Sequence, residues 1–388
     1  MREMGRILMG PGPGDVHPRV LRAMSTPLLG HLDPAFLQIM NEMMDSLRYV
    51  FETKNELTLA MSGTGSAGME TVFVNLIEPG DKVIIGVNGV FGTRMADVAA
   101  RAGAEVLEVK GKWGGIIEPD DVEQVLKQHG DIKLIALVHA ETSTGVLQPL
   151  KEIGEMARKY EALFVCDMVT SLGGVHVKTD EYKVDAAYSG TQKCLSAPPG
   201  LSPVTFSERA AAVLAKRKSK VQSWYLDLSM IQNYWGEERF YHHTAPISMI
   251  YALKEALLLI EEEGLDNVTE RHRLYGAALQ AGLEAMGLEL LVGEKHRLPQ
   301  LTSVKVPDGV NDAAFRARLL EKYGLEIGGG LGELKGKIWR IGLMGYNAKQ
   351  VNVTLLLSAF EDVLSELGVP IAKGEALQAM RRYVRSCC

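Results

Sequence analysis

Residues 57 to 87 read LTLAMSGTGSAGMETVFVNLIEPGDKVIIGV, and three elements can be predicted within them. The runs at 57–62 and 82–87 are short and largely apolar, a pattern typical of buried strands. Between them, residues 66–77 carry apolar side chains at helical spacing, and Pro79-Gly80 marks the turn into the second strand. A strand, a helix and a strand in this order predict two parallel strands of one sheet, joined by a covering helix.

The alternation continues on both sides of this stretch. We expect further strands at residues 104–109, 133–140 and 162–167, and helices at 34–52, 92–102, 119–128 and 149–160. Such alternation predicts an α/β fold, with a mainly parallel sheet covered by helices on both faces.

The pattern changes near residue 265, where longer helices and fewer strands predict a smaller α+β domain. These elements are expected as helices at 270–286, 311–323 and 349–367 and as strands at 301–306 and 337–343. We therefore divide the chain into an N-terminal arm (1–20), a large domain (21–263) and a small C-terminal domain (264–388).

The composition indicates a soluble protein that acts on small molecules. The 388 residues include 42 basic and 48 acidic ones, and a net charge of -6 argues against nucleic acid or an anionic membrane as a partner. The four cysteines show neither a CxxC pair nor a zinc-like spacing, so no metal site is expected. We find no signal-peptide core and no run of about 20 apolar residues. A cytoplasmic location fits best.

Ligands of an open parallel sheet bind beyond the carboxyl ends of its strands. At one such end, residues 62–70 read SGTGSAGME, and glycines at a helix N-terminus let the backbone approach a phosphate. A purely structural glycine turn is the alternative. The residues also match GxGxxG, but Asn88-Gly89 stand where a nicotinamide site would need an acidic residue for the ribose.

Three charged residues stand in unusual surroundings. Asp167 closes an apolar strand, where its carboxylate either faces a ligand or caps the following segment. Lys193 lies among small residues before Pro198-Pro199-Gly200, and a desolvated lysine can lose its proton and form a Schiff base. Arg340 lies inside an apolar strand and needs an anionic partner, either an internal acid or a substrate carboxylate.

A phosphate site, a strand-end carboxylate, a desolvated lysine and a buried arginine are together what pyridoxal phosphate requires. The lysine would hold the cofactor, and the carboxylate would keep the pyridine nitrogen protonated. A nicotinamide-dependent oxidoreductase and a cofactor-free binding protein are the alternatives from other classes.

The chain also resembles the class V aminotransferases and, within them, the alanine–glyoxylate / serine–glyoxylate (serine–pyruvate) aminotransferase family. The resemblance extends from the GPGP arm to the strand bearing Arg340, through SGTGSAGME, NGVFGTR, HAETSTGVLQPL, CDMVTSLGG, YSGTQKCLSAPPG, YHHTAP and RIGLMG. It implies the pyridoxal-phosphate-dependent transferase fold of type I. It also implies ping-pong transfer of an amino group between alanine or serine and glyoxylate or pyruvate.

The resemblance implies a role for each matching residue. Lys193 would carry the cofactor and move a proton at the substrate α-carbon, and Asp167 would pair with the pyridine nitrogen. Phe91 would stack on the cofactor ring, where relatives often have tryptophan. Arg340 would hold the substrate carboxylate, with Gly30 also in the substrate site. Contacts to the phosphate or to the polar edge of the ring are implied for Thr64, Gly65, Ser66, Thr142 and Gln192.

The motif YHHTAP bears on assembly. In relatives Tyr241 and Thr244 reach the phosphate bound by the neighbouring subunit, which implies a homodimer with shared active sites. From the residues alone, His242-His243 could also be half of a metal site, but no acidic or cysteine partner stands nearby.

The choice of substrate is less constrained. A single carboxylate-binding arginine, with no second cation evident near these motifs, favours substrates with one carboxylate. Related class V enzymes act on ureidoglycine, aminoethylphosphonate or aspartate, and few side chains separate them.

Overall fold

The computed structural model describes residues 5–236 and 238–387, and a seven-stranded sheet forms its centre. The strand order is β2-β10-β9-β8-β5-β3-β4, and only β10 runs antiparallel to its neighbours. The strands are β2 (Leu57–Ser62), β3 (Lys82–Val87), β4 (Glu105–Lys110), β5 (Ile132–Val138), β8 (Leu163–Asp167), β9 (Ala186–Tyr188) and β10 (Leu201–Phe206). The predicted mainly parallel sheet is therefore confirmed.

Helices pack against this sheet and enclose a single large apolar cluster. All five side chains of β8 are buried, as expected for a parallel strand covered on both faces. The helices are α1 (Pro18–Met24), α2 (Pro34–Phe51), α3 (Gly65–Leu76), α4 (Val90–Arg101), α5 (Pro119–His129), α6 (Lys151–Lys159), α7 (Glu208–Ala215), α8 (Leu228–Trp235) and α9 (Ile247–Glu263). The short strands β6 (Ala140–Glu141) and β7 (Val146–Leu147) form a hairpin after β5.

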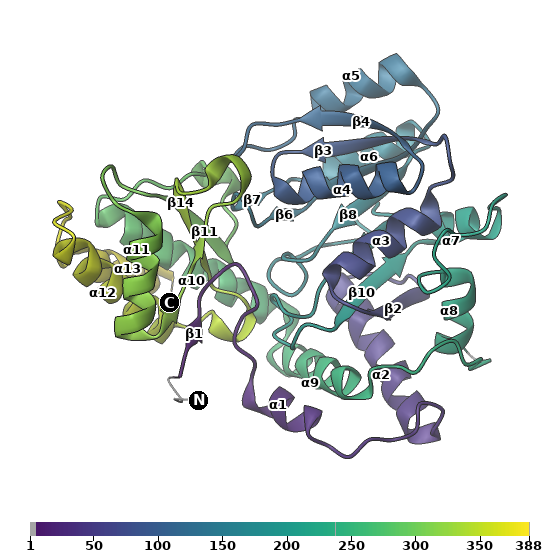
Figure 1. The fold of residues 1–388 in the computed structure, drawn as a ribbon, viewed down its shortest axis with the longest axis horizontal. Helices are drawn as coiled ribbons and strands as arrows, with labels where there is room; N and C mark the ends of the chain where they lie inside the picture. The colour runs from purple at the N-terminus through teal and green to yellow at the C-terminus, as the bar shows by residue number, and fades with distance from the viewer. Residues whose placement is uncertain (1–4, 237, 388) are drawn as a thin grey trace.

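The C-terminal unit lies beside the sheet-bearing unit (Figure 1) and has its own apolar core around Phe315, Trp339 and Phe360. Its sheet has the order β11-β14-β13 and is antiparallel. Its elements are α10 (Leu265–Ala285), β11 (Leu301–Lys305), α11 (Asp312–Tyr323), β12 (Leu325–Glu326), β13 (Gly328–Gly329), β14 (Ile338–Gly342), α12 (Gln350–Glu366) and α13 (Glu375–Cys387), with 3-10 turns at Glu294–His296, Gly332–Leu334 and Gly345–Asn347.

The N-terminal stretch connects the two units. Its strand β1 (Ile7–Leu8) pairs with β12 of the C-terminal unit, and Met9 belongs to that unit's core. The chain then passes between the units before it enters α1 (Figure 1). The domain limits proposed above stay predictions. No helix of the described residues is long and apolar enough to cross a bilayer.

Candidate active site

A cavity of about 220 Å³ opens at the carboxyl edge of the parallel strands. Its walls come from the segments that follow β2, β3, β5, β8 and β9, as the rule for open sheets predicts. The structure brings together eight of the residues that the sequence singled out: Thr64, Gly65, Ser66, Phe91, Thr142, Asp167, Gln192 and Lys193.

Lys193 lies at this cavity with only 9% of its surface exposed. Burial lowers its pKa to about 8, so at pH 7 about a tenth of the amine is unprotonated, far more than for an exposed lysine. The amine donates a hydrogen bond to the Pro11 carbonyl. Gly12 has a φ of 99°, and a Cβ atom there would come within 2.6 Å of the lysine side chain. The glycine-rich arm thus packs directly on the lysine.

Asp167 ends β8 and is 2% exposed. Its Oδ1 accepts a hydrogen bond from the Val169 N–H at 2.9 Å, so the predicted capping of the next segment is realised by one oxygen. Its Oδ2 is buried and makes no hydrogen bond of normal geometry to the described residues, and the Tyr188 hydroxyl lies near enough to lower the pKa of the carboxyl in part. Burial raises the pKa of this carboxyl to about 7. One oxygen is therefore left to accept a donor from a ligand.

The N-terminus of α3 forms another wall. The helix begins at Gly65, its cap residue Thr64 makes no side-chain capping bond, and its first turn has no acidic residue. The first N–H groups of a helix lack intrahelical partners and attract anions. Gln192 lies beside them in the same wall, and its side-chain NH2 group is a donor of the kind that an anion accepts from. This end of the cavity is suited to a phosphate group.

The first turn of α4 places Phe91 in the wall, and Arg94 lies one turn further on. The Arg94 guanidinium lies 5.0 Å from the centre of the Phe91 ring, a cation–π contact. The expectation of no second cation near the motifs is therefore wrong. The i,i+3 spacing after a strand end could have revealed Arg94, because both residues then share one helix face.

Arg340 lies beside the cavity, on the middle strand β14 of the C-terminal sheet, and is 6% exposed. Its Nη1 donates to the Thr142 carbonyl at 3.1 Å and its Nε to the Gly329 carbonyl at 2.7 Å. No carboxylate lies within ion-pair distance of it in residues 5–236 and 238–387, so the alternative of a directly paired internal acid is not realised; the buried Glu141 raises its pKa from a longer distance. Burial lowers its pKa to about 10, so it remains a cation at neutral pH.

Three further residues predicted for the site do not line this cavity in their own chain: Gly30, Tyr241 and Thr244. Tyr241 is 58% exposed, and its hydroxyl lies 3.3 Å from the Thr244 hydroxyl. Gly30 lies in the loop before α2, next to Asp33. The neighbouring His243 bonds the Ser62 hydroxyl at 2.7 Å.

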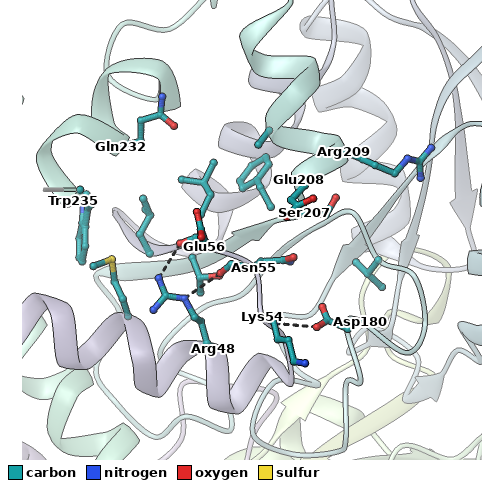
Figure 2. Close-up of a pocket in the computed structure, with 18 of the residues that line it drawn as sticks. Arg48, Lys54, Asn55, Glu56, Asp180, Ser207, Glu208, Arg209, Gln232 and Trp235 are labelled. Atoms are coloured by element: carbon teal, nitrogen blue, oxygen red, sulfur yellow. Dashed lines mark hydrogen bonds between the residues drawn. The ribbon is translucent and has the colours of Figure 1, made fainter.

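A larger hollow, of about 1110 Å³, lies at the opposite edge of the sheet, where β2 begins and β10 ends. Some of its charged side chains are used within the protein, as Figure 2 shows for Arg48, which donates to the Asn55 and Glu56 carbonyls. Asp180 accepts from the backbone N–H of Lys54 at 2.9 Å. None of the residues that the sequence singled out for chemistry lines this hollow.

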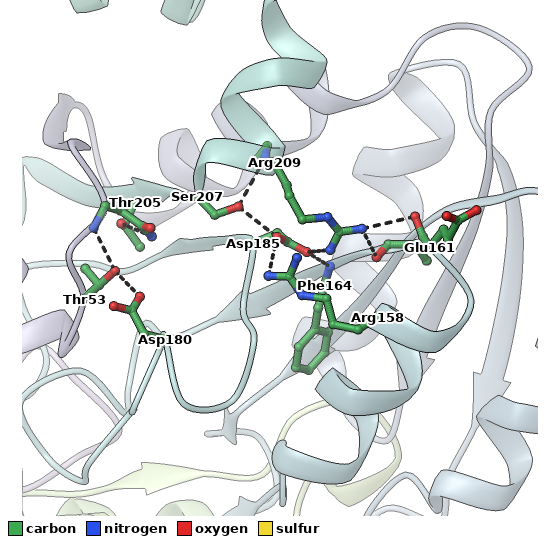
Figure 3. Close-up of polar contacts among 12 residues, drawn as sticks. Thr53, Arg158, Glu161, Phe164, Asp180, Asp185, Thr205, Ser207 and Arg209 are labelled. Carbon is green, nitrogen blue, oxygen red and sulfur yellow. Dashed lines mark hydrogen bonds and ion pairs between the residues drawn. The ribbon is translucent and has the colours of Figure 1, made fainter.

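A buried cluster of ion pairs around Asp185 lies at this same edge of the sheet, opposite the first cavity (Figure 3). Asp185 is fully buried and pairs with Arg209 at 2.9 Å and with Arg158 at 3.2 Å. It also accepts hydrogen bonds from the Ser207 hydroxyl and the Phe164 N–H. Both oxygens are thus satisfied, in contrast to Asp167, and the cluster is structural.

Pyridoxal phosphate fits the first cavity. The unpartnered Oδ2 of Asp167 is placed to accept a hydrogen bond from a protonated pyridine nitrogen. The start of α3 suits the phosphate, and the Lys193 amine suits the aldehyde. These groups all line one cavity, so the residues present match the group.

Comparisons with known proteins agree with this chemistry. The family described as Aminotransferase class-V matches residues 22–350. The crystal structure of an alanine–glyoxylate aminotransferase from Nostoc sp. is 50% identical, with a TM-score of 0.92, and covers 94% of this chain and 96% of that one. The ureidoglycine–glyoxylate aminotransferase of Bacillus subtilis is 46% identical, with a TM-score of 0.96, over 99% of this chain and 100% of that one. The alanine–glyoxylate aminotransferase of Callithrix jacchus is 43% identical over 92% of this chain and 87% of its own.

The match to the family covers most of the chain, and these relatives are similar over nearly their whole length. The nicotinamide and cofactor-free alternatives are thereby excluded. The chain belongs to the class V aminotransferases, pyridoxal-phosphate-dependent enzymes that transfer an amino group between small amino acids and oxo acids.

Proposed function

We propose that this aminotransferase moves the amino group of alanine or serine to glyoxylate or pyruvate by a ping-pong mechanism. The observation that carries the proposal is Arg340, a buried guanidinium without an acidic partner in the described chain, hydrogen-bonded to the cavity residue Thr142. A substrate carboxylate would supply the missing anion through two parallel hydrogen bonds. Holding the carboxylate there directs the α-carbon toward Lys193.

Each side chain of the cavity has its own role in the proposed reaction. When bound, pyridoxal phosphate supplies an electron sink that stabilises negative charge at the substrate α-carbon. Asp167 would hold the ring nitrogen positive, and Phe91 would pack on the ring face. Lys193, with a pKa of about 8, accepts the α-proton as a neutral amine and returns it during transfer. Arg340 keeps the substrate oriented throughout.

The names of the relatives support glyoxylate as the acceptor, because it appears in both the alanine and the ureidoglycine transaminases. (S)-Ureidoglycine is the second candidate donor, since the Bacillus enzyme named for it is 45% identical over 96% of this chain. Arg94 favours it in one respect: its guanidinium lines the cavity and could donate to a ureido carbonyl. Alanine and serine need no such contact.

Substitution of Arg340 by lysine tests the carboxylate site. The substitution keeps the charge but loses the two-pronged geometry, so we expect the KM for alanine to rise roughly 10- to 100-fold. The visible spectrum of the bound cofactor should not change. Steady-state kinetics and bleaching of that spectrum by alanine, serine, aspartate and ureidoglycine measure both effects.

Arg297→Lys is the matched control, because this arginine pairs with Glu284 outside the cavity. It should behave as the wild type. If neither alanine nor serine changes the spectrum while another donor does, the proposed donor is wrong. If Arg340→Lys leaves every KM unchanged, the carboxylate lies elsewhere.

A homodimer with shared active sites is part of the proposal. Large apolar side chains are exposed near the YHHTAP motif: Trp224 at 62%, Phe240 at 64% and Tyr241 at 58%, with Leu28 at 66%. Such side chains are usually covered by a partner. Tyr241 and Thr244, which lie away from the cavity of their own chain, would then complete the site of the second copy.

Hybrid dimers test this sharing of sites. We expect Lys193→Ala and the double variant Tyr241→Phe/Thr244→Val each to be poorly active alone. A hybrid of the two, purified through two different tags, has one site with both lesions and one with neither. It should regain about half of the wild-type activity, as isologous sharing requires. An inactive hybrid would show that Tyr241 and Thr244 act within their own chain.

The proposed location is the cytoplasm. Cys166 and Cys194 are buried as free thiols, which a reducing compartment preserves.

A further inference from the structure

Glu141 is a buried carboxylate that the roles above do not use. It lies in the hairpin after β5, next to the cavity residue Thr142, and has no exposed surface. Burial raises its pKa, whereas four hydrogen bonds to its oxygens favour the charged form. Burying a carboxyl group is costly unless its hydrogen bonds are satisfied, so these contacts define what it does.

The contacts of Glu141 lead to the helix that carries Phe91. Its Oε2 accepts from the N–H groups of Phe91 at 3.1 Å and Gly92 at 3.3 Å. Its Oε1 accepts from the N–H and hydroxyl of Ser143, and the Ser143 hydroxyl in turn accepts from the Val90 N–H at 2.9 Å. The N-terminal amides of α4 are thus held by the β6 hairpin.

Helix α4 has no capping group of its own. Its cap residue is Gly89, and its first turn has no acidic residue. A Cβ atom at Gly89 would overlap the Glu141 side chain, so the glycine allows the carboxylate to reach the helix end. A negative charge at this end also stabilises the helix dipole. Glu141 therefore binds the first amides of the helix, including the N–H of Phe91 itself.

The same hairpin also contacts Arg340, the residue proposed to bind the substrate carboxylate. Thr142, the next residue, lines the cavity, and its carbonyl accepts from Arg340 Nη1 at 3.1 Å. One short segment therefore contacts the helix that carries Phe91 through residue 141, and Arg340 through residue 142. A shift of this segment would move both.

We propose that Glu141 is a positioning residue, which fixes Phe91 against the cofactor ring and Thr142 against Arg340 by capping α4 from the β6 hairpin. The inference rests on the roles proposed for Phe91 and Arg340. It adds a buried carboxyl group outside the lining of the cavity, which aligns the groups that would contact the cofactor and the substrate.

Glu141→Gln tests the inference, because the amide keeps the shape but brings an N–H donor against backbone N–H groups. We expect the dissociation constant for pyridoxal phosphate, titrated into the cofactor-free protein, to rise roughly 10-fold. The KM for alanine should rise with it. The visible circular dichroism of the bound cofactor should weaken, because the ring is held less rigidly. Glu141→Asp, which keeps the charge, should recover part of each loss.

Asp185→Asn is the matched control, since it neutralises an equally buried carboxylate at the opposite edge of the sheet. It should lower the melting temperature without changing cofactor affinity, circular dichroism or KM. If Glu141→Gln behaves in the same way as this control, the inference is overturned. Should Glu141→Gln not fold, Ser143→Ala removes one contact of the same cap and should give a smaller effect of the same kind, and wild-type values would overturn the inference.

Phe91→Ala and Arg340→Lys, measured in parallel, separate the two levels of the proposal. If Phe91→Ala weakens cofactor binding and Arg340→Lys raises the KM, but Glu141→Gln does neither, then only the positioning role fails. If neither has an effect, the proposed roles of Phe91 and Arg340 fail, and the inference fails with them.

Discussion

Replacing Lys193 with alanine is expected to lower kcat/KM for transamination roughly 10⁴-fold or more, because it removes a positioned acid–base group that also holds the cofactor. No other lysine of the described chain lines the cavity. The variant should still bind pyridoxal phosphate through the α3 end and Asp167. It should lack the visible absorbance of the lysine-bound cofactor. Steady-state rates and absorption spectra measure the two effects.

Two controls distinguish amine chemistry from charge. Lys183→Ala removes an exposed lysine at the opposite edge of the sheet and should leave the rate unchanged. Lys193→Arg keeps a cation but no nucleophilic amine, and activity in it would contradict the assignment. Because burial lowers the Lys193 pKa to about 8, the neutral amine becomes more abundant as pH rises through 8. Cofactor capture by the empty wild-type protein should accelerate over the same range.

The large-scale fold could be predicted because its elements are strongly patterned. The strand-helix-strand stretch at 57–87 is found as β2, α3 and β3, with limits within one residue of those predicted. Strand β8 is buried on both faces, so its sequence is nearly all apolar and could not be mistaken for a loop. Wherever local periodicity matched the final environment, prediction was reliable.

Strand β10 is not among the predicted elements, and its sequence contains Pro203, a residue that argues against a central strand. The structure accommodates the proline where β9 ends: β9 pairs with β10 only up to Tyr188, opposite Val204. The Pro203 carbonyl still accepts from the Ser189 N–H at 2.8 Å. Tertiary context, which the sequence does not display, decides such a case.

In the candidate site, too, some features could be predicted from the sequence and others depend on tertiary context. Lys193, Asp167 and the start of α3 follow strand ends, so their meeting in one cavity could be expected from the topology rule. The capping of α4 by Glu141 could not, because the two are separated by about 50 residues and no local motif links them. Likewise, the lack of an acid beside Arg340 depends on every neighbour in three dimensions.

Asp167→Asn is expected to lower kcat roughly 10²- to 10³-fold while leaving the fold intact, because an amide cannot stabilise a positive charge on the ring nitrogen. The geometry of the carboxyl is kept, including the bond from the Val169 N–H to Oδ1. Kinetics at saturating cofactor measure the loss. Asp185→Asn, which alters a carboxylate remote from the cavity, should retain kcat. An active Asp167→Asn enzyme would show that the ring nitrogen needs no negative partner.

The same substitution should change how the stability of the empty protein depends on pH. The folded pKa of Asp167 is raised from 3.8 to about 7, so between these values the unfolded chain loses its proton while the folded protein keeps it. Stability contributed by this group is therefore full below about pH 4 and is lost as pH rises toward 7, by at most about 4 kcal/mol. Asparagine does not titrate, so the melting temperature of wild type relative to the variant should fall between about pH 4 and pH 7 and level off above that. Pyridoxal phosphate should restore the wild type more than the variant at pH 8, because a protonated ring nitrogen lowers the cost of the buried charge. A difference in melting temperature that stays constant with pH would mean that the Asp167 carboxyl is already ionised in the empty cavity.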